Sequence, residues 1–305
     1  MNRVNIPKMK EKILKSYYSL FNNNSWSLIE EDWDNIIILD ACRYDMFEDL
    51  NSIDGQLESR WTYSSNTPEY IENNFVDETY NNTIYVTSNP IYRVDEWVSG
   101  NIKGSFDKII DVWIEGWDDK LGTVHPRTMY DTAVDVNELY PNKKLVIHFM
   151  QPHYPFIGNT GKEEIGKQDL RGRVKALEQG DIDNPRNVWE LLDQGEVAVE
   201  TIWKAYRENL QIVLEYTERL VEDLCGKTII TADHGNLVRE RAHPFPFKLS
   251  GHPKGIYTEK LVKVPWHTVK YESRKEISDD KSERRNDIQK SDESVEERLS
   301  DLGYL

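Results

Sequence analysis

An aspartate and a histidine stand side by side directly after a short β-branched run. Residues Thr228 to Thr231 predict a buried strand, because β-branched side chains fit the two-sided environment of a pleated sheet. This strand would carry Asp233 and His234 to its carboxyl end, where Gly235 allows a sharp turn. A carboxylate beside an imidazole is a natural pair of ligands for a divalent metal. The tripeptide alone is equally typical of a turn without chemistry.

A second acidic residue follows a second apolar run far upstream. Residues Asn35 to Leu39 predict another buried strand, and Asp40 comes directly after it. Two parallel strands of one sheet that both end in aspartate place their carboxylates on the same edge, where open α/β sheets bind ligands. We therefore expect Asp40, Asp233 and His234 to converge on one metal ion.

Hydroxyl side chains precede a predicted helix start in the stretch 64–71. Thr67 has the character of an N-cap, Pro68 suits the first helical position, and Glu69 favours the first turn. A plain capped helix explains Thr67 and Pro68 but not the hydroxyl of Ser65. A hydroxyl at a helix amino terminus also lies where backbone N–H groups favour an anion, which makes Thr67 a candidate nucleophile and Ser65 the second candidate.

Three histidines lie in or beside loops that follow predicted strands. His148 and His153 flank the end of a predicted strand at Lys144–Met150, and His252 lies between a glycine and a proline. A single histidine in a proline-rich loop is more often structural than catalytic. Together with two aspartates, a metal and a hydroxyl, these histidines form a coherent set for phosphate or sulfate ester chemistry. They would protonate the leaving group or hold the oxygens of the anion.

The remaining pattern predicts alternating strands and helices. The stretch 187–224 has helical periodicity and leads into the strand at Thr228–Thr231, so strand–helix–strand order favours parallel pairing and an α/β fold. Residues 1–30 predict one amphipathic helix that packs on the outside of the domain, followed by a polar break. Further strands are predicted at Thr83–Thr87, Lys108–Trp113 and Leu261–Trp266.

Composition limits the class of protein. The 305 residues carry 38 basic and 54 acidic side chains, a net charge of −16, which argues against nonspecific nucleic-acid binding. No apolar run approaches the roughly 20 residues that span a bilayer, and the basic amino terminus lacks the features of a signal peptide. The two cysteines give no disulfide framework, so a cytoplasmic location is expected. Residues 270–305 are charged and poor in apolar side chains, which predicts a disordered tail after a catalytic domain at 31–269.

These features together resemble the alkaline phosphatase and sulfatase superfamily, and most closely the sulfatase-like proteins with a Leu-Asp-Ala-Cys-Arg-Tyr-Asp signature. The matching segments occur in the order of that superfamily: Leu39–Asp45, Thr67–Glu69, His148–Pro155, Thr231–Gly235, and Gly251–Pro253 continuing through Val264–Trp266. The resemblance implies an alkaline-phosphatase-like α/β fold, with a mainly parallel central sheet and helices on both faces. It also implies a divalent metal cofactor, as one or two ions of Zn, Mn, Mg or Ca.

The resemblance implies roles for individual residues. It makes Asp40, Asp233 and His234 metal ligands and Thr67 the nucleophile, with Ser65 as the alternative. His252 would meet a second metal or the substrate anion, and His153 would face the substrate. Arg43 and His148 are the remaining candidates for substrate contacts, although Arg43 and Asp45 also suit a local supporting role.

Three departures from the superfamily shape the functional hypothesis. The chain has no Cys-x-Pro-Ser-Arg element, no convincing Asp-x-x-x-His pair upstream of Asp233, and no membrane helices like those of the phosphoethanolamine and lipoteichoic-acid transferases. The leading hypothesis is a metal-dependent hydrolase of small-molecule or glycan phosphate or sulfate esters that acts through a covalent threonine intermediate. The alternatives are a transferase of the phospho or sulfo group to a glycan or polar acceptor, and an inactive protein of the same fold that binds an anion or glycan.

Overall fold

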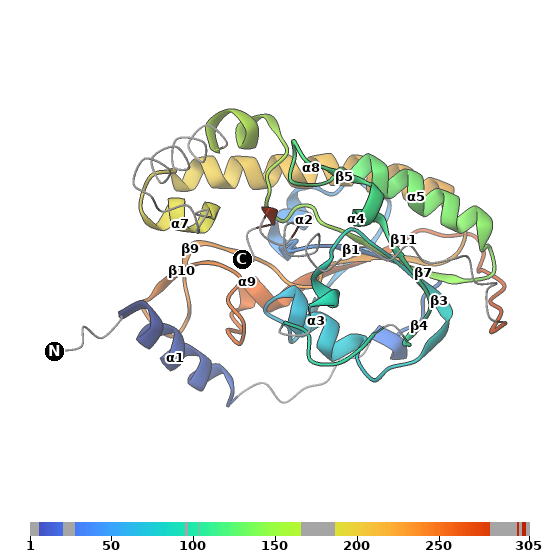
Figure 1. Cartoon of the computed structure of the whole chain (residues 1–305), viewed down its shortest axis with the longest axis horizontal. Helices are drawn as coiled ribbons and strands as arrows, with labels where there is room; N and C mark the ends of the chain where they lie inside the picture. Colours follow the sequence, from blue (N-terminus) through green and yellow to red (C-terminus); the bar gives the residue numbers. More distant parts are fainter. Residues whose placement is uncertain are drawn as a thin grey trace.

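The structure is a computed structural model that describes residues 6–20, 28–94, 97–102, 104–165 and 187–280, together with 298, 301 and 302. Its centre is a seven-stranded sheet with the strand order β2-β11-β8-β1-β7-β3-β4 (Figure 1). The block from β8 to β4 is parallel, whereas β11 is antiparallel to both of its neighbours, β8 and β2. The strands span Thr228–Thr231 (β8), Asn35–Leu39 (β1), Lys144–Phe149 (β7), Tyr80–Thr87 (β3), Phe106–Asp111 (β4), Lys263–Val269 (β11) and Gly55–Trp61 (β2).

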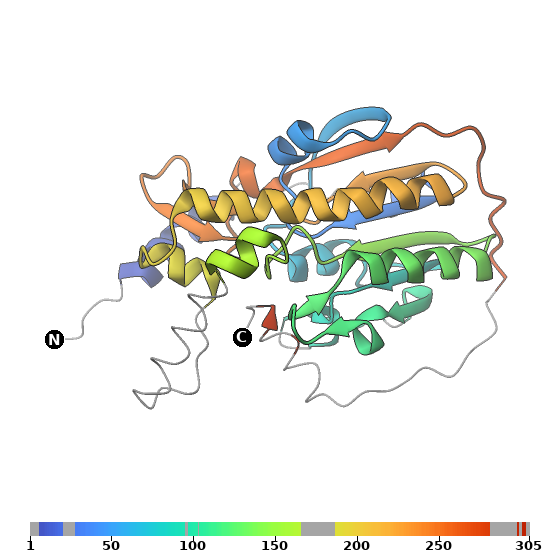
Figure 2. The ribbon, with the colours of Figure 1, turned by 90° about the horizontal axis from the view of Figure 1, so that it is seen from above.

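Helices cover both faces of this sheet. The long helix α8 (Val199–Asp223) lies beside α5 (Pro126–Leu139) on one face, as Figure 2 shows, and α2 (Tyr44–Leu50) packs on that face against α8 and β11. Helix α3 (Thr67–Asn74) lies on the opposite side of the sheet (Figure 1). The predicted α/β fold with a mainly parallel central sheet and helices on both faces is therefore confirmed.

Short elements complete the described part of the chain. They are α4 (Val112–Glu115), α7 (Val188–Asp193), α9 (Glu259–Val262), the pair β5 (Trp117–Asp118) and β6 (Thr123–Val124), the hairpin β9 (Leu237–Arg241) and β10 (Lys248–Gly251), the 3₁₀ turns η1 (Leu28–Glu30) and η2 (Ile91–Arg93), and the π-helical turn η3 (Gly161–Ile165).

Central position in the sheet explains why two strands were predictable to the residue. All side chains of β1 and β8 are buried, because both strands have neighbours on each side and helices above and below. Continuous apolar or β-branched runs are typical of such strands. The predicted strands Asn35–Leu39 and Thr228–Thr231 are confirmed.

Other predicted boundaries were wrong where tertiary contacts decide the backbone. The strand predicted at Lys108–Trp113 ends at Asp111 and turns into α4, with the Trp113 indole donating to the Asp111 carboxylate. The predicted strand at Leu261–Trp266 begins only at Lys263, since Leu261 belongs to α9. The helical stretch 187–224 is two helices separated at Gly195, whose φ of 75° does not continue a helix.

The amino-terminal helix α1 (Ile6–Tyr18) packs against the segments around the β9–β10 hairpin and α9. Its buried residues Leu14 and Tyr18 form a small apolar cluster with Leu237, Ile256 and Leu261, separate from the main core. The polar break predicted at 22–25 lies outside the described residues.

Residues 271–280 cross the amino-terminal edge of the parallel strands and form a belt. Arg274 donates to both carboxylates that precede β1, Asp32 and Asp34. Lys275 donates to the Asn137 side chain, and Asp279 accepts from Asn82. Residues 281–297 lie outside the described part, so the predicted tail boundary at 269 stays a prediction. Among the described helices, none has both the length and the apolar character that crossing a membrane requires.

Candidate functional site

The carboxyl ends of β1 and β8 bring two aspartates and a histidine together. The parallel register pairs Ile38 with Thr231, so Asp40 and Asp233, each two residues further along, reach the same level of the sheet. One ligand atom from each of Asp40, Asp233 and His234 lies within 4.8 Å of the other two, and all three side chains are fully buried. The convergence follows from strand pairing alone.

Each of the two carboxylates is held through one oxygen and leaves the other oxygen without a hydrogen-bond partner among the described residues. Asp233 Oδ1 accepts from the backbone N–H groups of Ala41 (2.9 Å) and His234 (2.8 Å), whereas its Oδ2 has no partner. Asp40 Oδ2 accepts from Asn89 Nδ2 (2.9 Å), and Asp40 Oδ1 has no partner. The orientation of both carboxylates is therefore fixed by the protein.

The tautomer of His234 follows from its contact with a carbonyl. His234 Nδ1 lies 2.7 Å from the Gly235 oxygen, which can only accept, so Nδ1 carries the proton and the Nε2 lone pair remains for a ligand. Nε2 lies 3.4 Å from Asp233 Oδ2 and 3.7 Å from Asp40 Oδ1, the two unpartnered oxygens.

The donor set fits a divalent metal. Burial raises the pKa of Asp40 well above its usual value, and the nearby Asp233 charge raises it further. Two buried carboxylates with unpartnered oxygens are costly unless a cation compensates them. Two carboxylate oxygens and one imidazole nitrogen are ligands that Zn, Mn and related ions accept. The residues present thus match the cofactor that the sequence predicted.

A glycine makes this arrangement possible for a steric reason. A Cβ on Gly235 would lie 2.1 Å from the backbone oxygen of Lys260, and the Gly235 N–H donates to the Leu261 oxygen at 2.6 Å. Close approach of two backbones, rather than an unusual φ, therefore requires glycine after His234.

The hydroxyl of Thr67 reaches the cluster from the start of α3. Its Oγ1 lies 3.2 Å from His234 Nε2 and 3.4 Å from Asp40 Oδ2. The predicted cap was wrong by one position: Asn66 is the N-cap and accepts from the Glu69 N–H at 3.0 Å, so Thr67 is the first helical residue. Capping by Asn66 leaves the Thr67 hydroxyl for the site.

Ser65, the alternative nucleophile, is engaged in a different network. Its hydroxyl donates to Glu69 Oε2 (2.7 Å) and accepts from the Gly255 N–H (2.9 Å). Glu69 also accepts from the hydroxyl of Tyr257 at 3.1 Å. These contacts tie the loop before α3 to the segment that follows His252.

Two of the predicted loop histidines form a row with His234, in which His252 lies between His234 and His153. The ring of His252 lies 4.6 Å from that of His234 and 4.9 Å from that of His153, between centroids. Burial lowers the pKa of His153 to about 4 and that of His252 well below its usual value. Both are therefore neutral at pH 7 and can bind a metal or hydrogen-bond an anion through N–H.

His148 and Arg43 are also placed by the structure. His148 is fully buried on β7, its Nδ1 lies 2.8 Å from the Tyr85 hydroxyl, and burial lowers its pKa to about 4. The Arg43 guanidinium binds Asp45, Glu240 and a backbone oxygen, and lies over the Trp203 ring. A substrate contact for either residue stays a prediction.

Asn89 is the site residue that the sequence reasoning missed. It follows the end of β3 at Thr87, where parallel strands deliver polar side chains to the same edge. Its Oδ1 accepts from the Ile91 N–H (2.9 Å), which leaves Nδ2 for Asp40. The Ser-Asn-Pro sequence directly after a predicted strand is the signal that could have identified it.

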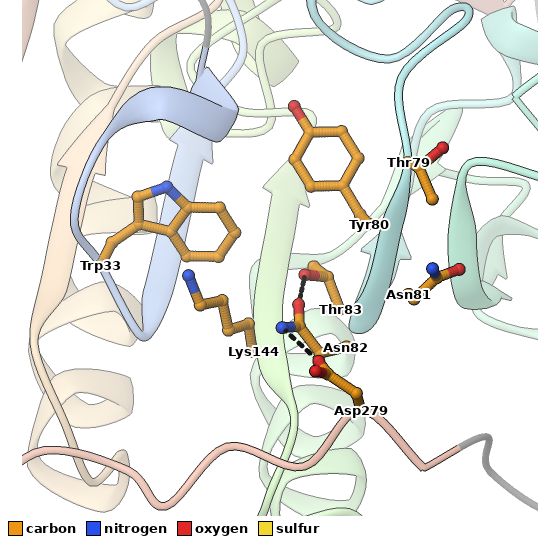
Figure 3. A pocket seen from close by; sticks show the side chains of 8 residues that line it. All are labelled: Trp33, Thr79, Tyr80, Asn81, Asn82, Thr83, Lys144 and Asp279. Atoms are coloured by element: carbon orange, nitrogen blue, oxygen red, sulfur yellow. Dashed lines mark hydrogen bonds between the residues drawn. The ribbon is translucent and has the colours of Figure 1, made fainter.

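A separate pocket of about 400 Å³ lies at the opposite, amino-terminal edge of the sheet (Figure 3). It is formed where the belt passes β3 and β7, and Asn82 donates to Asp279 across it. Its lining combines aromatic, amide and hydroxyl side chains with one lysine and one aspartate: Trp33, Thr79, Tyr80, Asn81, Asn82, Thr83, Lys144 and Asp279. No residue of the Asp40 cluster contributes to it.

No family model matches the chain, and no curated protein matches it in sequence. Solved structures do match. The C-terminal periplasmic domain of EcEptC from Escherichia coli aligns over 83% of this chain and 74% of that chain, with 12% identity and a TM-score of 0.46. The same domain in complex with Zn gives 81% and 74%, with 12% identity and a TM-score of 0.41.

A third solved structure extends the range of similar proteins. Ps i-CgsB in complex with k-i-k-neocarrahexaose aligns over 78% of this chain and 66% of that chain, with 12% identity and a TM-score of 0.37. These identities and TM-scores are low, so the matches describe a similarity and assign no activity to this chain.

Proposed function

We propose that this chain is a metal-dependent hydrolase of phosphate or sulfate esters, a member of the alkaline phosphatase and sulfatase superfamily that acts through a covalent intermediate on Thr67. The observation that carries the proposal is the Thr67 hydroxyl in contact with both His234 and Asp40, inside a cluster with unpartnered carboxylate oxygens. A hydroxyl, a cation site and neutral histidines in one buried place are what such ester cleavage requires.

The chain's own residues divide the work. Asp40, Asp233 and His234 would hold the ion, with Asn89 and the Ala41 N–H fixing the carboxylates. A bound divalent ion would supply Lewis acidity and offset the negative charge of the ester. Thr67 Oγ1 would form the new bond to phosphorus or sulfur while the bond to the ester oxygen breaks.

Protons balance over two steps. In the first step the Thr67 hydroxyl loses a proton and the leaving oxygen takes one up. In the second step water attacks the phosphorus or sulfur, the bond from that atom to Thr67 Oγ1 breaks, and the hydroxyl takes its proton back from the water. His252, which lies against His234, and His153, which lies against His252, are neutral and would hydrogen-bond the remaining oxygens of the anion.

Aryl phosphate and aryl sulfate esters, assayed with Zn, Mn, Mg or Ca, test this function. Thr67→Ala should lower kcat by at least about 10³-fold, as expected for loss of a nucleophile, and leave metal binding largely intact. Ser65→Ala is the matched control, because its hydroxyl bonds Glu69 and Gly255 instead.

The outcomes separate the alternatives. Turnover that needs an added glycan or polar alcohol indicates a transferase. Metal binding without turnover of any ester indicates a binding protein of the same fold. If Ser65→Ala abolishes turnover and Thr67→Ala only slows it, the nucleophile has been misassigned.

A further inference from the structure

Exposed cations gather on the hairpin that links two parts of the candidate site. Strand β9 begins at Leu237, shortly after His234, and β10 ends at Gly251, directly before His252. Since the rings of His252 and His234 lie 4.6 Å apart, both ends of the hairpin are anchored at the site. Three exposed, positively charged side chains form the basic face of the hairpin: Arg239, Arg241 and Lys248.

The register of the hairpin places two of these cations directly opposite each other. Arg241 of β9 pairs with Lys248 of β10, and both side chains are exposed. Opposite side chains of an antiparallel pair have Cβ atoms about 4.5–5.5 Å apart, and like charges at such positions are destabilising. Neither side chain forms an ion pair with another residue of the part of the chain that the structure describes. An anionic ligand would compensate this unfavourable pairing.

Arg239 adds a third cation at a backbone position that does not favour arginine. The register shifts between Leu249 and Gly251, and in the part of β9 that faces this shift Arg239 has a φ of 53°. Residues with a long side chain adopt this left-handed region only at an energetic cost. Glu240, the one acidic residue in the sequence of the hairpin, binds Arg43 instead. The hairpin itself therefore offers no acidic side chain to its basic face.

Helix α1 continues the basic surface beside the hairpin (Figure 1). It carries four lysines and one glutamate, and Lys10 Nζ lies 5.5 Å from the centre of the Phe247 ring, next to Lys248 in the chain. The rings of Tyr17 and Phe245 meet edge to face at 5.3 Å, so helix and hairpin form one surface. A basic surface on a chain with a net charge of −16 is complementary to a polyanion.

The packing of α1 favours a soluble anionic chain over a lipid surface as the partner. A helix that binds a membrane buries its apolar face in the lipid. The apolar face of α1 instead packs against the protein through Leu14 and Tyr18. The lysines of α1 therefore act through charge, together with the basic face of the hairpin.

We propose that the basic face of the hairpin, extended by Lys10, binds the repeating anionic groups of a sulfated or phosphorylated glycan. The inference rests on the proposed function and gives its substrate class: one ester would lie at Thr67 while neighbouring anionic groups of the same chain contact the hairpin. The backbone from Lys248 to His252 spans at most about 13 Å. A glycan of several units bridges such a distance, whereas a small monoester does not.

Fluorescein-labelled dextran sulfate is the probe, and fluorescence anisotropy gives its Kd. Arg241→Gln/Lys248→Gln should raise the Kd at least about tenfold, because two charge-assisted contacts are lost. The wild-type Kd should also rise with added NaCl. The matched control is Arg219→Gln/Lys270→Gln, which removes the same two charges from exposed positions after the middle of α8 and after β11, and it should retain the wild-type Kd.

Turnover of an aryl ester connects this surface to the site. Dextran sulfate should inhibit wild-type turnover competitively, and the inhibition constant should rise at least about tenfold in Arg241→Gln/Lys248→Gln, in parallel with the Kd. The kcat/KM of that variant for the aryl ester alone should equal the wild-type value, because the monoester does not reach the hairpin.

Arg239→Asn separates binding from stability. Asparagine tolerates a φ of 53°, so the variant should not lower the Tm, yet it should weaken dextran sulfate binding because the charge is lost. An unchanged Kd in folded Arg241→Gln/Lys248→Gln, an equal loss in the control variant, or equal binding of uncharged dextran overturns the inference and leaves the proposed function standing.

Two further outcomes have distinct meanings. Binding to vesicles of phosphatidylserine and phosphatidylcholine that requires Arg241 and Lys248, without binding of dextran sulfate, assigns the basic face to a lipid surface and overturns the inference. A wild-type protein that binds dextran sulfate through the hairpin but turns over no ester overturns the proposed function, and with it the substrate role of the hairpin.

Discussion

Replacement of Asp40 by asparagine should have opposite effects on stability without and with metal. Asn89 Nδ2 can still donate to the new amide oxygen, so the local hydrogen bond survives. The charge does not. Ligand atoms of Asp40 and Asp233 lie within 4.8 Å, and two unit charges at that separation repel by about 3.5 kcal/mol at an effective dielectric constant of 20. The raised pKa of Asp40 relieves part of this repulsion by protonation.

We therefore expect Asp40→Asn to stabilise the metal-free protein by about 1–3 kcal/mol. Wild type should gain about 2.7 kcal/mol when the free metal concentration is 100 times its Kd, whereas Asp40→Asn, which lacks an anionic ligand, should gain little. The difference in unfolding free energy between the two proteins thus shifts toward wild type by about 2–3 kcal/mol on addition of metal.

Urea unfolding in EDTA and in saturating Zn²⁺ or Mn²⁺ measures both values. Asp45→Asn is the control, because Asp45 binds Arg43 and Lys260 outside the cluster, and its loss should lower stability similarly in both conditions. If Asp40→Asn destabilises the protein equally with and without metal, the reasoning about repelling carboxylates is refuted.

Three further predictions concern the pH dependence of metal binding at Asp40, the ion pair of Arg274 and the packing of α1. At a pH below the raised pKa of Asp40, a proton competes with the metal ion for the carboxylate. In that range the metal association constant, measured by calorimetry, should rise about tenfold for each unit of pH. An association constant that does not change with pH contradicts this. Burial raises the pKa of Asp34, but the hydrogen bonds that it accepts, the strongest from Arg274, lower the pKa below its usual value. Arg274→Ala should therefore lower the free energy of unfolding by about 1–2 kcal/mol at pH 7. That cost should shrink as acid protonates Asp34, and an equal loss in acid and at pH 7 would exclude the ion pair. Leu14→Ala, at a fully buried position, should cost about 2–4 kcal/mol by thermal or urea unfolding, and a loss below about 0.5 kcal/mol would show that α1 does not pack there in solution.

The sequence located the site through the parallel strands. Asp40, Asp233 and His234 could be predicted together because β1 and β8 are buried runs, and parallel strands present their carboxyl ends at one edge. That logic needs only strand positions and direction. It does not need the order of the strands in the sheet.

Strand β2, the start of β11 and the antiparallel direction of β11 were beyond that reasoning. Strand β2 is an edge strand with mostly exposed or half-buried side chains, so it has no continuous apolar run to mark it. Strand β11 starts after the single helical turn α9, and its apolar residues merge with those of α9 in the sequence. Short apolar runs do not distinguish a strand from a buried helical turn.

Register, which no single segment contains, decides the roles of the remaining polar residues. His148 occurs inside an apolar run and by position alone resembles a core histidine on β7. Pairing with Ile38 on one side and Thr87 on the other places it on the face of Asp40 and below it. Asn89, two residues after Thr87, reaches the level of Asp40 by the same rule. Since β1, β3 and β7 are separated by long stretches of chain, only the pairing of the strands in the sheet shows that Asp40, Asn89 and His148 come close together.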